Sequence, residues 1–297
     1  MSGKQDHLVC VGLGKCAAFL GKRLATLGWH VSGSARNGDK CAELLDQGFE
    51  VVVFDGTARA PALRELLGTA THLLLSAPPD AQGDPVLRHH GEDIAAAANL
   101  RWIGYLSTVG VYGDYDGDWV DEDAPLKPAT ERGKRRVDAE RAWRDLAERL
   151  SVPLAIFRLA GIYGPSGNQL LSMRAGTAKR IVKPGQVFNR IHIADIATVL
   201  ERSIAHPPAG VRAYNVCDDE PTPPQDVVAY AADLLGMVPP LETSFDEADL
   251  SAMARSFYAD NKRCRNERIK QELGVELAFP TYREGLAALL REMKDQQ

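Results

Sequence analysis

The sequence lacks the marks of membrane, secreted and metal-binding proteins. No run approaches the roughly 20 apolar residues that span a bilayer, and the start MSGKQDHLVC holds no apolar signal core, so we expect a cytoplasmic protein. The five cysteines form no CxxC pair and are expected to be free thiols. The seven histidines include no HExxH pattern, so no metal is expected, and His89 and His90 are interpreted as an exposed pair on a helix.

An excess of positive charge is also missing. Lys and Arg number 35 against 40 Asp and Glu, which gives a net charge of −5. This balance argues against nonspecific nucleic-acid binding as the main task, although it is compatible with a local basic patch. With 297 residues, the chain has room for one large domain or for a domain with a smaller appendage.

Short apolar runs alternate with helical patterns over the first two-thirds of the chain. The expected strands cover 8–11, 29–34, 50–54, 71–76, 101–107 and 154–159, and the expected helices cover 15–27, 40–47, 61–67, 84–98 and 131–150. Apolar strands that alternate with helices are typical of a parallel sheet covered on both faces. The pattern therefore predicts an α/β fold with a Rossmann-type, doubly wound parallel sheet.

The domain organisation follows from where this pattern loosens. We expect a dinucleotide-binding domain over 1–165, to which 190–216 returns. Proline clusters after residue 206 mark loops, so 166–189 and 217–297 are expected to form a smaller C-terminal substrate-binding cap.

A glycine-rich turn stands between the first expected strand and the first expected helix. Its GxGxxA pattern supplies a tight turn, a close approach of backbone to pyrophosphate, and a small residue for helix packing. The helix N-terminus would then attract the phosphates. The alternative interpretation is a glycine turn that serves packing and binds no ligand. The predicted cofactor-binding residues of this turn are Gly12, Leu13, Gly14, Lys15 and Ala17.

The end of the second strand predicts the cofactor. An NAD site usually has an acid there, whereas this sequence has Ser34 and Arg36, which would bind a 2′-phosphate. We therefore predict NADP(H) rather than NAD(H); an ordinary surface arginine is the alternative interpretation of Arg36. Residues after the third and fourth strands complete the predicted cofactor site: Asp55, Ser76, Ala77 and Pro78.

Four later segments match a known family in order. YLSTVGVYG (105–113), FRLAGIYGP (157–165), RIHIADIA (190–197) and YNV (214–216) make the chain resemble the extended short-chain dehydrogenases/reductases, the NAD(P)-dependent epimerase/dehydratase-like family. The resemblance is to its atypical subgroup. It implies an NADP(H)-dependent reductase, epimerase or dehydratase acting on a small polar or anionic carbonyl or hydroxyl substrate. It also implies a homodimer, paired through the helices expected at 84–98 and 131–150. The stripe with Trp143 would anchor that dimer or pack on its own sheet.

The catalytic motif departs from the family. Thr108 matches the Ser/Thr position, but Arg132 stands where the tyrosine of YxxxK belongs and Arg136 where the lysine belongs. Arginine stays charged, so it binds or stabilises anions rather than exchanging protons. The predicted roles are anion binding for Arg132 and cofactor-ribose contact for Arg136. Tyr112 is the candidate replacement phenol, ahead of Tyr163.

Two alternatives follow from that departure. A non-enzymatic NADP(H)-binding sensor would need no catalytic phenol, and a different Rossmann dehydrogenase would share the glycine turn but not the later segments. Thr108 has the further interpretation of a strand-end hydroxyl that caps backbone. His192 is interpreted as a structural histidine and Asp195 as a residue that begins or caps a helix.

Overall fold

The computed structural model describes residues 5–295. The chain divides into two compact units. The first comprises residues 1–108, 134–158 and 197–214, and the second comprises residues 109–133, 159–196 and 215–297.

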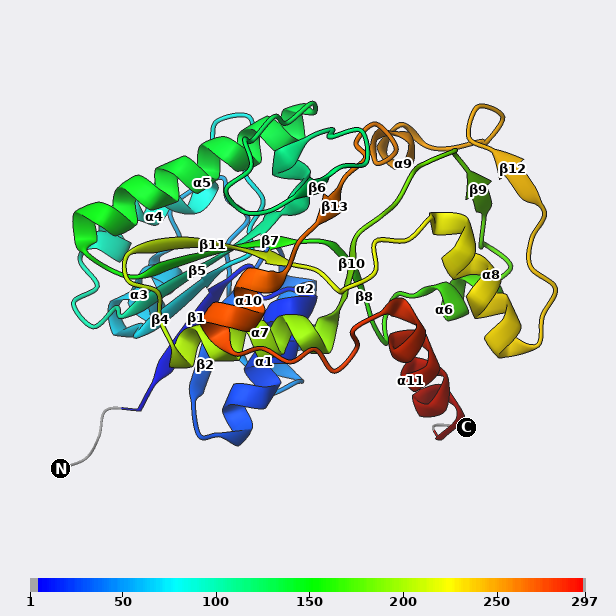
Figure 1. The fold of residues 1–297 in the computed structure, drawn as a ribbon. Coiled ribbons are helices and arrows are strands. Elements are labelled where there is room, and N and C mark those ends of the chain that lie inside the picture. The colour runs from blue at the N-terminus through cyan, green and yellow to red at the C-terminus, as the bar shows by residue number, and fades with distance from the viewer. Residues whose placement is uncertain (1–4, 296–297) are drawn as a thin grey trace. The chain divides into compact units, whose positions relative to one another are not determined.

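A seven-stranded sheet forms the centre of the first unit (Figure 1). Its strands are β1 (His7–Val11), β2 (His30–Ala35), β3 (Glu50–Val53), β4 (His72–Leu75), β5 (Trp102–Thr108), β7 (Leu154–Leu159) and β11 (Val211–Val216). They lie in the order β11-β7-β5-β4-β1-β2-β3, and the registers from β3 to β5 are parallel. The strand order reverses beside β1, as in a doubly wound fold. The predicted Rossmann-type sheet is confirmed.

Helices cover both faces of this sheet (Figure 1). They are α1 (Lys15–Thr26), α2 (Gly38–Leu45), α3 (Pro61–Thr69), α4 (Pro85–Ala95), α5 (Glu131–Leu150) and α7 (Ile193–Ala205). Side chains of α3, α4 and α5 share one buried cluster with the strands. On the other face, α1 and α7 lie together, because Arg23 of α1 forms an ion pair with Glu201 of α7.

The apolar stripe of α5 packs on its own sheet. Trp143 has no exposed surface, and its Nε1 donates a hydrogen bond to Asp84 at 2.9 Å. Of the two predicted places for this stripe, the core of the chain is therefore the right one, and Trp143 does not anchor a dimer.

The prediction of an exposed histidine pair was wrong for His90. Its side chain has no exposed surface, and its Nδ1 lies 2.9 Å from Asp93 Oδ2. Its Nε2 accepts a hydrogen bond from the backbone N–H of Ala60. The reason is helical spacing, because His90 lies between the buried Val86 and Ile94 at intervals of four residues on α4.

The second unit consists of three short parallel strand pairs and several helices. The pairs are β6 (Trp119–Val120) with β13 (Arg263–Cys264), β8 (Gly161–Tyr163) with β10 (Arg190–His192), and β9 (Arg180–Val182) with β12 (Glu242–Ser244). The helices are α6 (Gln169–Arg174), α8 (Pro224–Leu235), α9 (Ala252–Ser256), α10 (Glu267–Leu273) and α11 (Tyr282–Asp295), besides the 3-10 turn Val109–Tyr112. Side chains of α6, α8 and α11 form its core.

The expected cap segments, 166–189 and 217–297, both fall in this second unit. It also takes in 109–133, 159–165, 190–196 and 215–216, which the sequence had placed with the dinucleotide-binding domain. The pairing of β6 with β13 and of β8 with β10 gives the physical reason, because each pair joins one such segment to a partner inside the unit.

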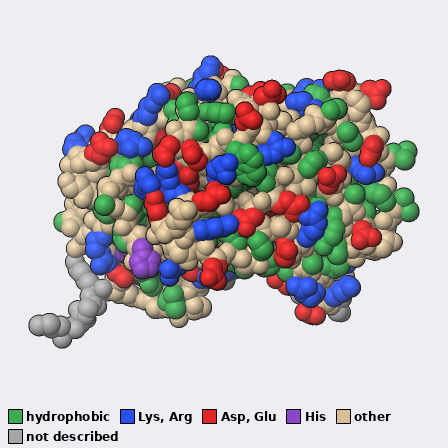
Figure 2. All heavy atoms as spheres, viewed as in Figure 1, with side chains coloured by type: hydrophobic (Ala, Val, Ile, Leu, Met, Phe, Trp, Pro, Cys, Tyr) green, Lys and Arg blue, Asp and Glu red, His purple; other side chains and the backbone are tan. Residues whose placement is uncertain are grey.

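The structure also bears on the expectations about membrane spans, cysteines, metal sites and surface charge. No helix within residues 5–295 is long and apolar enough to cross a membrane. All five cysteines are free and buried. The described part of the chain holds no group of three or more side chains suited to a metal ion. Figure 2 shows acidic and basic side chains interspersed on the face that it draws.

Candidate functional site

The glycine turn is held by backbone contacts that tolerate no side chain. Gly12 has a φ of 86°, and a Cβ on it would lie 2.9 Å from the backbone nitrogen of Ala77. Leu13 N–H donates to the carbonyl of Ser34 at 2.7 Å, and Gly12 N–H donates to Ser34 Oγ at 3.1 Å. The turn is thereby fixed against β2. No side-chain cap bond closes the first turn of α1 at Gly14, so an anion at this helix end would meet N–H groups and a positive dipole.

A cavity of about 640 Å³ opens over this turn. Its wall brings together nine of the predicted cofactor residues: Gly12, Leu13, Gly14, Ser34, Arg36, Asp55, Ser76, Ala77 and Pro78. Three others do not belong to the wall. Ala17 is fully buried in α1, where its small size serves packing, Lys15 is exposed, and Arg136 lies on α5.

The segment after β2 adds two polar residues that the sequence analysis did not single out. The basic Lys40 and the neutral Asn37 line the same cavity as Arg36. Asn37 accepts a hydrogen bond from Lys40 N–H at 2.9 Å and so begins α2. Two acids, Asp55 and Asp80, also lie in the wall. Hydrogen bonds from Arg88 lower the pKa of Asp80 to about 2, so it stays ionised.

Thr108 and Arg136 belong to the first unit. Thr108 is the last residue of β5 and is half-buried. Arg136 donates from Nη1 to Tyr105 Oη and to the Leu106 carbonyl, both at 3.0 Å. Burial raises the pKa of Tyr105 above its usual value, in spite of this cation. Arg136 is therefore fixed to the end of β5.

A buried ionic group supports the same strand end. Ser107 donates to Glu140, and Arg158 Nη2 donates to Glu140 Oε2 at 2.9 Å. All three side chains are nearly inaccessible. This contact joins β5, α5 and β7 behind the expected catalytic position, and the sequence analysis did not find it.

Tyr112 and Arg132 belong to the second unit. Tyr112 has no exposed surface, and its hydroxyl donates to Asn215 Oδ1 at 2.7 Å. A phenol in that position gives no support to Tyr112 as a proton donor to substrate. The exposed Arg132 lies over the ring of Phe257, 5.1 Å from its centroid.

The second unit contains a larger cavity, of about 840 Å³. Its wall includes Tyr163 and Phe257, three basic side chains (Lys179, Arg190 and Lys262) and the acidic Asp260. Val109 and Gly110, which follow Thr108 in the chain, also line it. Val109, Gly110 and Arg190 lie in segments that the sequence analysis matched to the family, but apart from Tyr163 none of these residues was proposed for the site.

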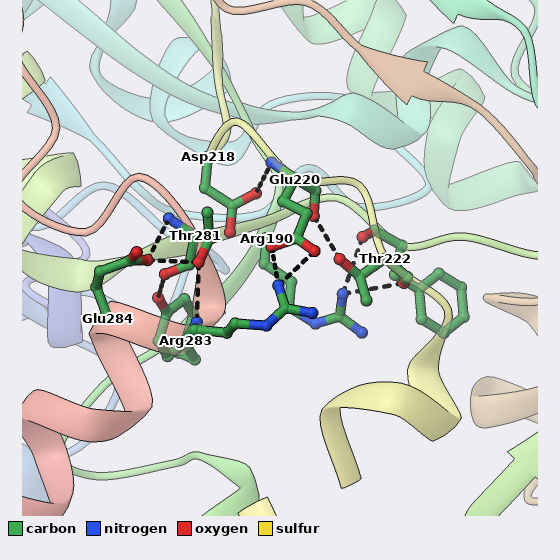
Figure 3. Close-up of polar contacts among 9 residues, drawn as sticks. Arg190, Asp218, Glu220, Thr222, Thr281, Arg283 and Glu284 are labelled. Atoms are coloured by element: carbon green, nitrogen blue, oxygen red, sulfur yellow. Dashed lines mark hydrogen bonds and ion pairs between the residues drawn. The ribbon is translucent and has the colours of Figure 1, made fainter. Parts of the chain in front are cut away.

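A polar network surrounds Arg190 of this cavity (Figure 3). Its Nη1 donates to the carbonyls of Phe188 and Thr222, at 3.0 and 3.1 Å. Asp218 N–H donates to the Arg190 carbonyl at 2.7 Å, while the Asp218 carboxyl accepts from Glu220 N–H. Burial raises the pKa of Asp218 to about 8.

The IHIADIA segment anchors the C-terminal part of the chain. The fully buried Asp195 lies in the first turn of α7, as predicted, but its carboxylate accepts from the N–H groups of Ala278 and Phe279 at 2.8 and 3.1 Å. His192 is buried, and its Nδ1 accepts from Ala194 N–H. Its Nε2 has no partner within residues 5–295, so this histidine is structural but not fully satisfied.

Comparison with solved structures finds proteins that are similar over the whole length of the chain. A conserved protein of unknown function from Silicibacter pomeroyi DSS is 49% identical, with 98% of this chain and 100% of that one covered and a TM-score of 0.88. A protein from Methylobacillus flagellatus, provisionally described as an NAD-dependent epimerase/dehydratase, is 25% identical over 98% and 100% of the two chains, with a TM-score of 0.72. The chain therefore shares the fold of NAD-dependent epimerase/dehydratase-like proteins, which agrees with the resemblance that its sequence motifs indicate.

A more distant likeness shows the fold alone. MoeE5, in complex with UDP-glucuronic acid and NAD, is 19% identical over 98% of this chain and 100% of its own, with a TM-score of 0.77. No protein-family model matches the chain, and no curated protein matches it significantly.

Proposed function

We propose that the chain is an NADP(H)-dependent enzyme of the epimerase, dehydratase or reductase type. Its substrate would be a small polar or anionic molecule with a carbonyl or hydroxyl group. The observation that carries the proposal is the glycine turn, which opens a 640 Å³ cavity with Arg36 in its wall. Complexes of NAD with proteins of the same fold, such as MoeE5, support a nicotinamide dinucleotide as the ligand.

The residues present fit such a cofactor. Gly12 and Gly14 leave the pyrophosphate position open, since the nearest atoms to a Cβ on Gly14 would lie about 4 Å away (3.9 and 4.0 Å). Arg36 and Lys40 would attract the 2′-phosphate that distinguishes NADP(H) from NAD(H). The cofactor, when bound, supplies hydride chemistry. Arg132 would bind an anionic group of the substrate. Thr108 ends β5, and Arg136 is held at the same strand end by its hydrogen bonds to Tyr105 and Leu106.

The experiment measures NADPH and NADH affinity of the wild type and of Arg36→Ala by fluorescence titration. We expect NADPH to bind more tightly, and Arg36→Ala to weaken NADPH binding about tenfold or more, because a charged hydrogen bond contributes roughly 1.5–3 kcal/mol. NADH binding should change little. Equal losses for both cofactors would refute the role of Arg36 as the reader of the 2′-phosphate.

A second candidate is an NADP(H)-binding sensor without catalysis. It is favoured by the absence of an accessible phenol at Tyr112, which is buried and donates to Asn215. The two candidates separate in one assay, in which NADPH-loaded protein is mixed with a panel of carbonyl compounds and nucleotide sugars. Oxidation of NADPH supports the enzyme. A sensor would oxidise none and would bind NADP⁺ and NADPH with different affinities.

A further inference from the structure

A further cavity, of about 470 Å³, lies in the first unit at the edge of the sheet where the strands begin. Its wall includes residues that stand at or just before the first residue of a strand: Asp6, Trp29, His72 and Arg101. Cofactors of the doubly wound fold bind at the other edge, where the strands end. The cavity shares no wall residue with the one over the glycine turn, so it is a separate feature of the chain.

His72 presents an unpaired ring nitrogen to this cavity. The residue is only 6% exposed, and its Nδ1 lies 2.9 Å from Thr71 Oγ1. Its Nε2 has no hydrogen-bond partner within residues 5–295 and is not among the fully enclosed atoms, so it reaches the open space of the cavity. A polar atom of an otherwise buried side chain marks a place where a ligand can supply the missing hydrogen bond.

The hydrogen bonds of Thr71 determine what this nitrogen can do. The Thr71 hydroxyl donates to the carbonyl of His7 at 3.1 Å and accepts from the N–H of His7 at 2.8 Å. Its single hydrogen is thus engaged, so the imidazole hydrogen lies on His72 Nδ1 and is donated to Thr71 Oγ1. Burial, assisted by the nearby Arg101, lowers the pKa of His72 to about 4, so the ring is neutral at pH 7. Nε2 is therefore an acceptor, and its ligand must be a donor.

Much of the remaining wall is apolar. Leu24, Leu27 and Ile204 line the cavity, and the ring of Trp29 lies with its centroid 4.7 Å from that of His72. Leu27 is 71% exposed and Trp29 is half-buried, so both leave apolar surface uncovered. A flat apolar ligand would remove this surface from water.

The charged side chains of the wall balance one another. Two are acidic, Asp6 and Glu201, and two are basic, Arg101 and Arg202. Arg101 forms an ion pair with Asp6, and Glu201 forms one with Arg23. A charged ligand would lose its hydration here without gaining an excess of opposite charge, so the wall favours an uncharged one.

We infer that this cavity is a binding site for a small, uncharged aromatic molecule with a hydroxyl or N–H group. The aromatic ring lies against Trp29 and Leu27, and the hydroxyl or N–H donates to His72 Nε2. The cavity has a suitable size, because small-molecule sites commonly measure about 300–1,000 Å³. The inference goes beyond the proposed function and does not depend on it.

The test is fluorine NMR titration of the full chain at pH 7 with 4-fluorophenol and with 4-fluoroanisole, in which a methyl group replaces the donated hydrogen. The wild type should bind 4-fluorophenol about threefold or more tightly than 4-fluoroanisole, which corresponds to one neutral hydrogen bond. The anion 4-fluorobenzoate should bind more weakly than 4-fluorophenol. His72→Phe removes the acceptor but keeps a flat ring, so this variant should bind 4-fluorophenol and 4-fluoroanisole equally.

A matched pair of tryptophan substitutions locates the binding. Ala205 is an exposed residue of the wall, so Ala205→Trp should fill the cavity and reduce the affinity for 4-fluorophenol about tenfold or more. Ala25 is exposed on α1 and does not belong to the wall, so Ala25→Trp should bind like the wild type. Thermal unfolding shows whether each variant is folded, and Ala205→Trp decides the question if His72→Phe does not fold.

Four results would overturn the inference. They are the absence of 4-fluorophenol binding to the wild type, equal or tighter binding of 4-fluoroanisole or 4-fluorobenzoate, an unchanged preference for the phenol in a folded His72→Phe, and equal binding by the two tryptophan variants. Displacement of 4-fluorophenol by NADPH would also overturn it, because the probe would then occupy the cofactor cavity. A wild type that binds 4-fluorophenol but not NADPH would refute the proposed function alone.

Discussion

The cavity over the glycine turn and the cavity around Arg190 are built in opposite ways. The residues around the first all fall between Gly12 and Pro85, at the ends of successive strands and the starts of the helices that follow. The residues around the second come from segments spread between Val109 and Leu286. Glycines and other small side chains are prominent in the first wall, whereas the second combines aliphatic side chains with long basic and aromatic ones. A cavity of the first kind is shaped by local sequence, whereas one of the second kind depends on distant tertiary contacts.

The largest expected effect on stability comes from replacing one buried carboxylate in each unit. Glu140→Gln leaves the buried Arg158 without its carboxylate, and we expect a loss of about 3–5 kcal/mol in the free energy of unfolding. Asp195→Asn weakens the hydrogen bonds that the carboxylate accepts from two backbone N–H groups, so about 1–3 kcal/mol is expected. Urea unfolding of both variants measures the difference. Equal losses would show that the two units depend equally on buried charge.

A pair of glycine substitutions sharpens the description of the first cavity. Gly12 and Gly48 have nearly the same φ, 86° and 87°, so alanine is strained at both positions. A Cβ on Gly48 meets nothing within 4 Å, whereas one on Gly12 meets the backbone of Ala77. We expect Gly12→Ala to cost about 1–2 kcal/mol more than Gly48→Ala and to weaken NADPH binding about tenfold or more. Urea unfolding and fluorescence titration measure the two effects.

If Gly12→Ala were no more harmful than Gly48→Ala, the close approach of the turn to Ala77 would not matter. The first cavity would then owe its shape to backbone strain alone.

A last comparison concerns acid stability in the two units. Burial lowers the pKa of His72 in the first unit and of His192 in the second from 6.5 to about 4. Between these values the unfolded chain binds protons that the folded chain does not. Stability is therefore complete above pH 6.5 and is lost as the pH falls towards 4. His192→Asn removes one of these groups, so its unfolding free energy should decline less steeply over this range.

Urea unfolding at several pH values between 4.5 and 7 measures that slope. An unchanged slope in His192→Asn would show that His192 contributes nothing to the acid sensitivity.

The difference between the cavities also explains what the sequence could predict. The glycine turn, Arg36 and the strand ends could be located because the residues next to each of them in the chain identify it. The position of Tyr112 could not, because its burial depends on Asn215, which is 103 residues away. The same holds for Arg190 and Lys262, which come together only in the wall of the cavity.

His90 shows how a helical period can be overlooked in a polar run. The segment RHHGED reads as solvent-exposed, yet the spacing of His90 from Val86 and Ile94 puts it in the core. The sequence shows that Arg132 and Arg136 stand in place of the tyrosine and lysine of the family motif. It does not show which group takes over from the lost phenol, because that depends on which side chains meet after folding.

The spread of the second wall has a consequence for synthesis on the ribosome. Every residue of the glycine-turn wall has been made by Pro85, less than a third of the way along the chain. The wall that contains Arg190 needs Tyr282 and Leu286, which are made long after Pro85. Since chains fold in the direction of their synthesis, a nascent chain would hold every residue of the first wall well before it holds those of the second. A chain that stalls before Tyr282 would therefore carry all the residues of the glycine-turn wall but lack part of the Arg190 wall.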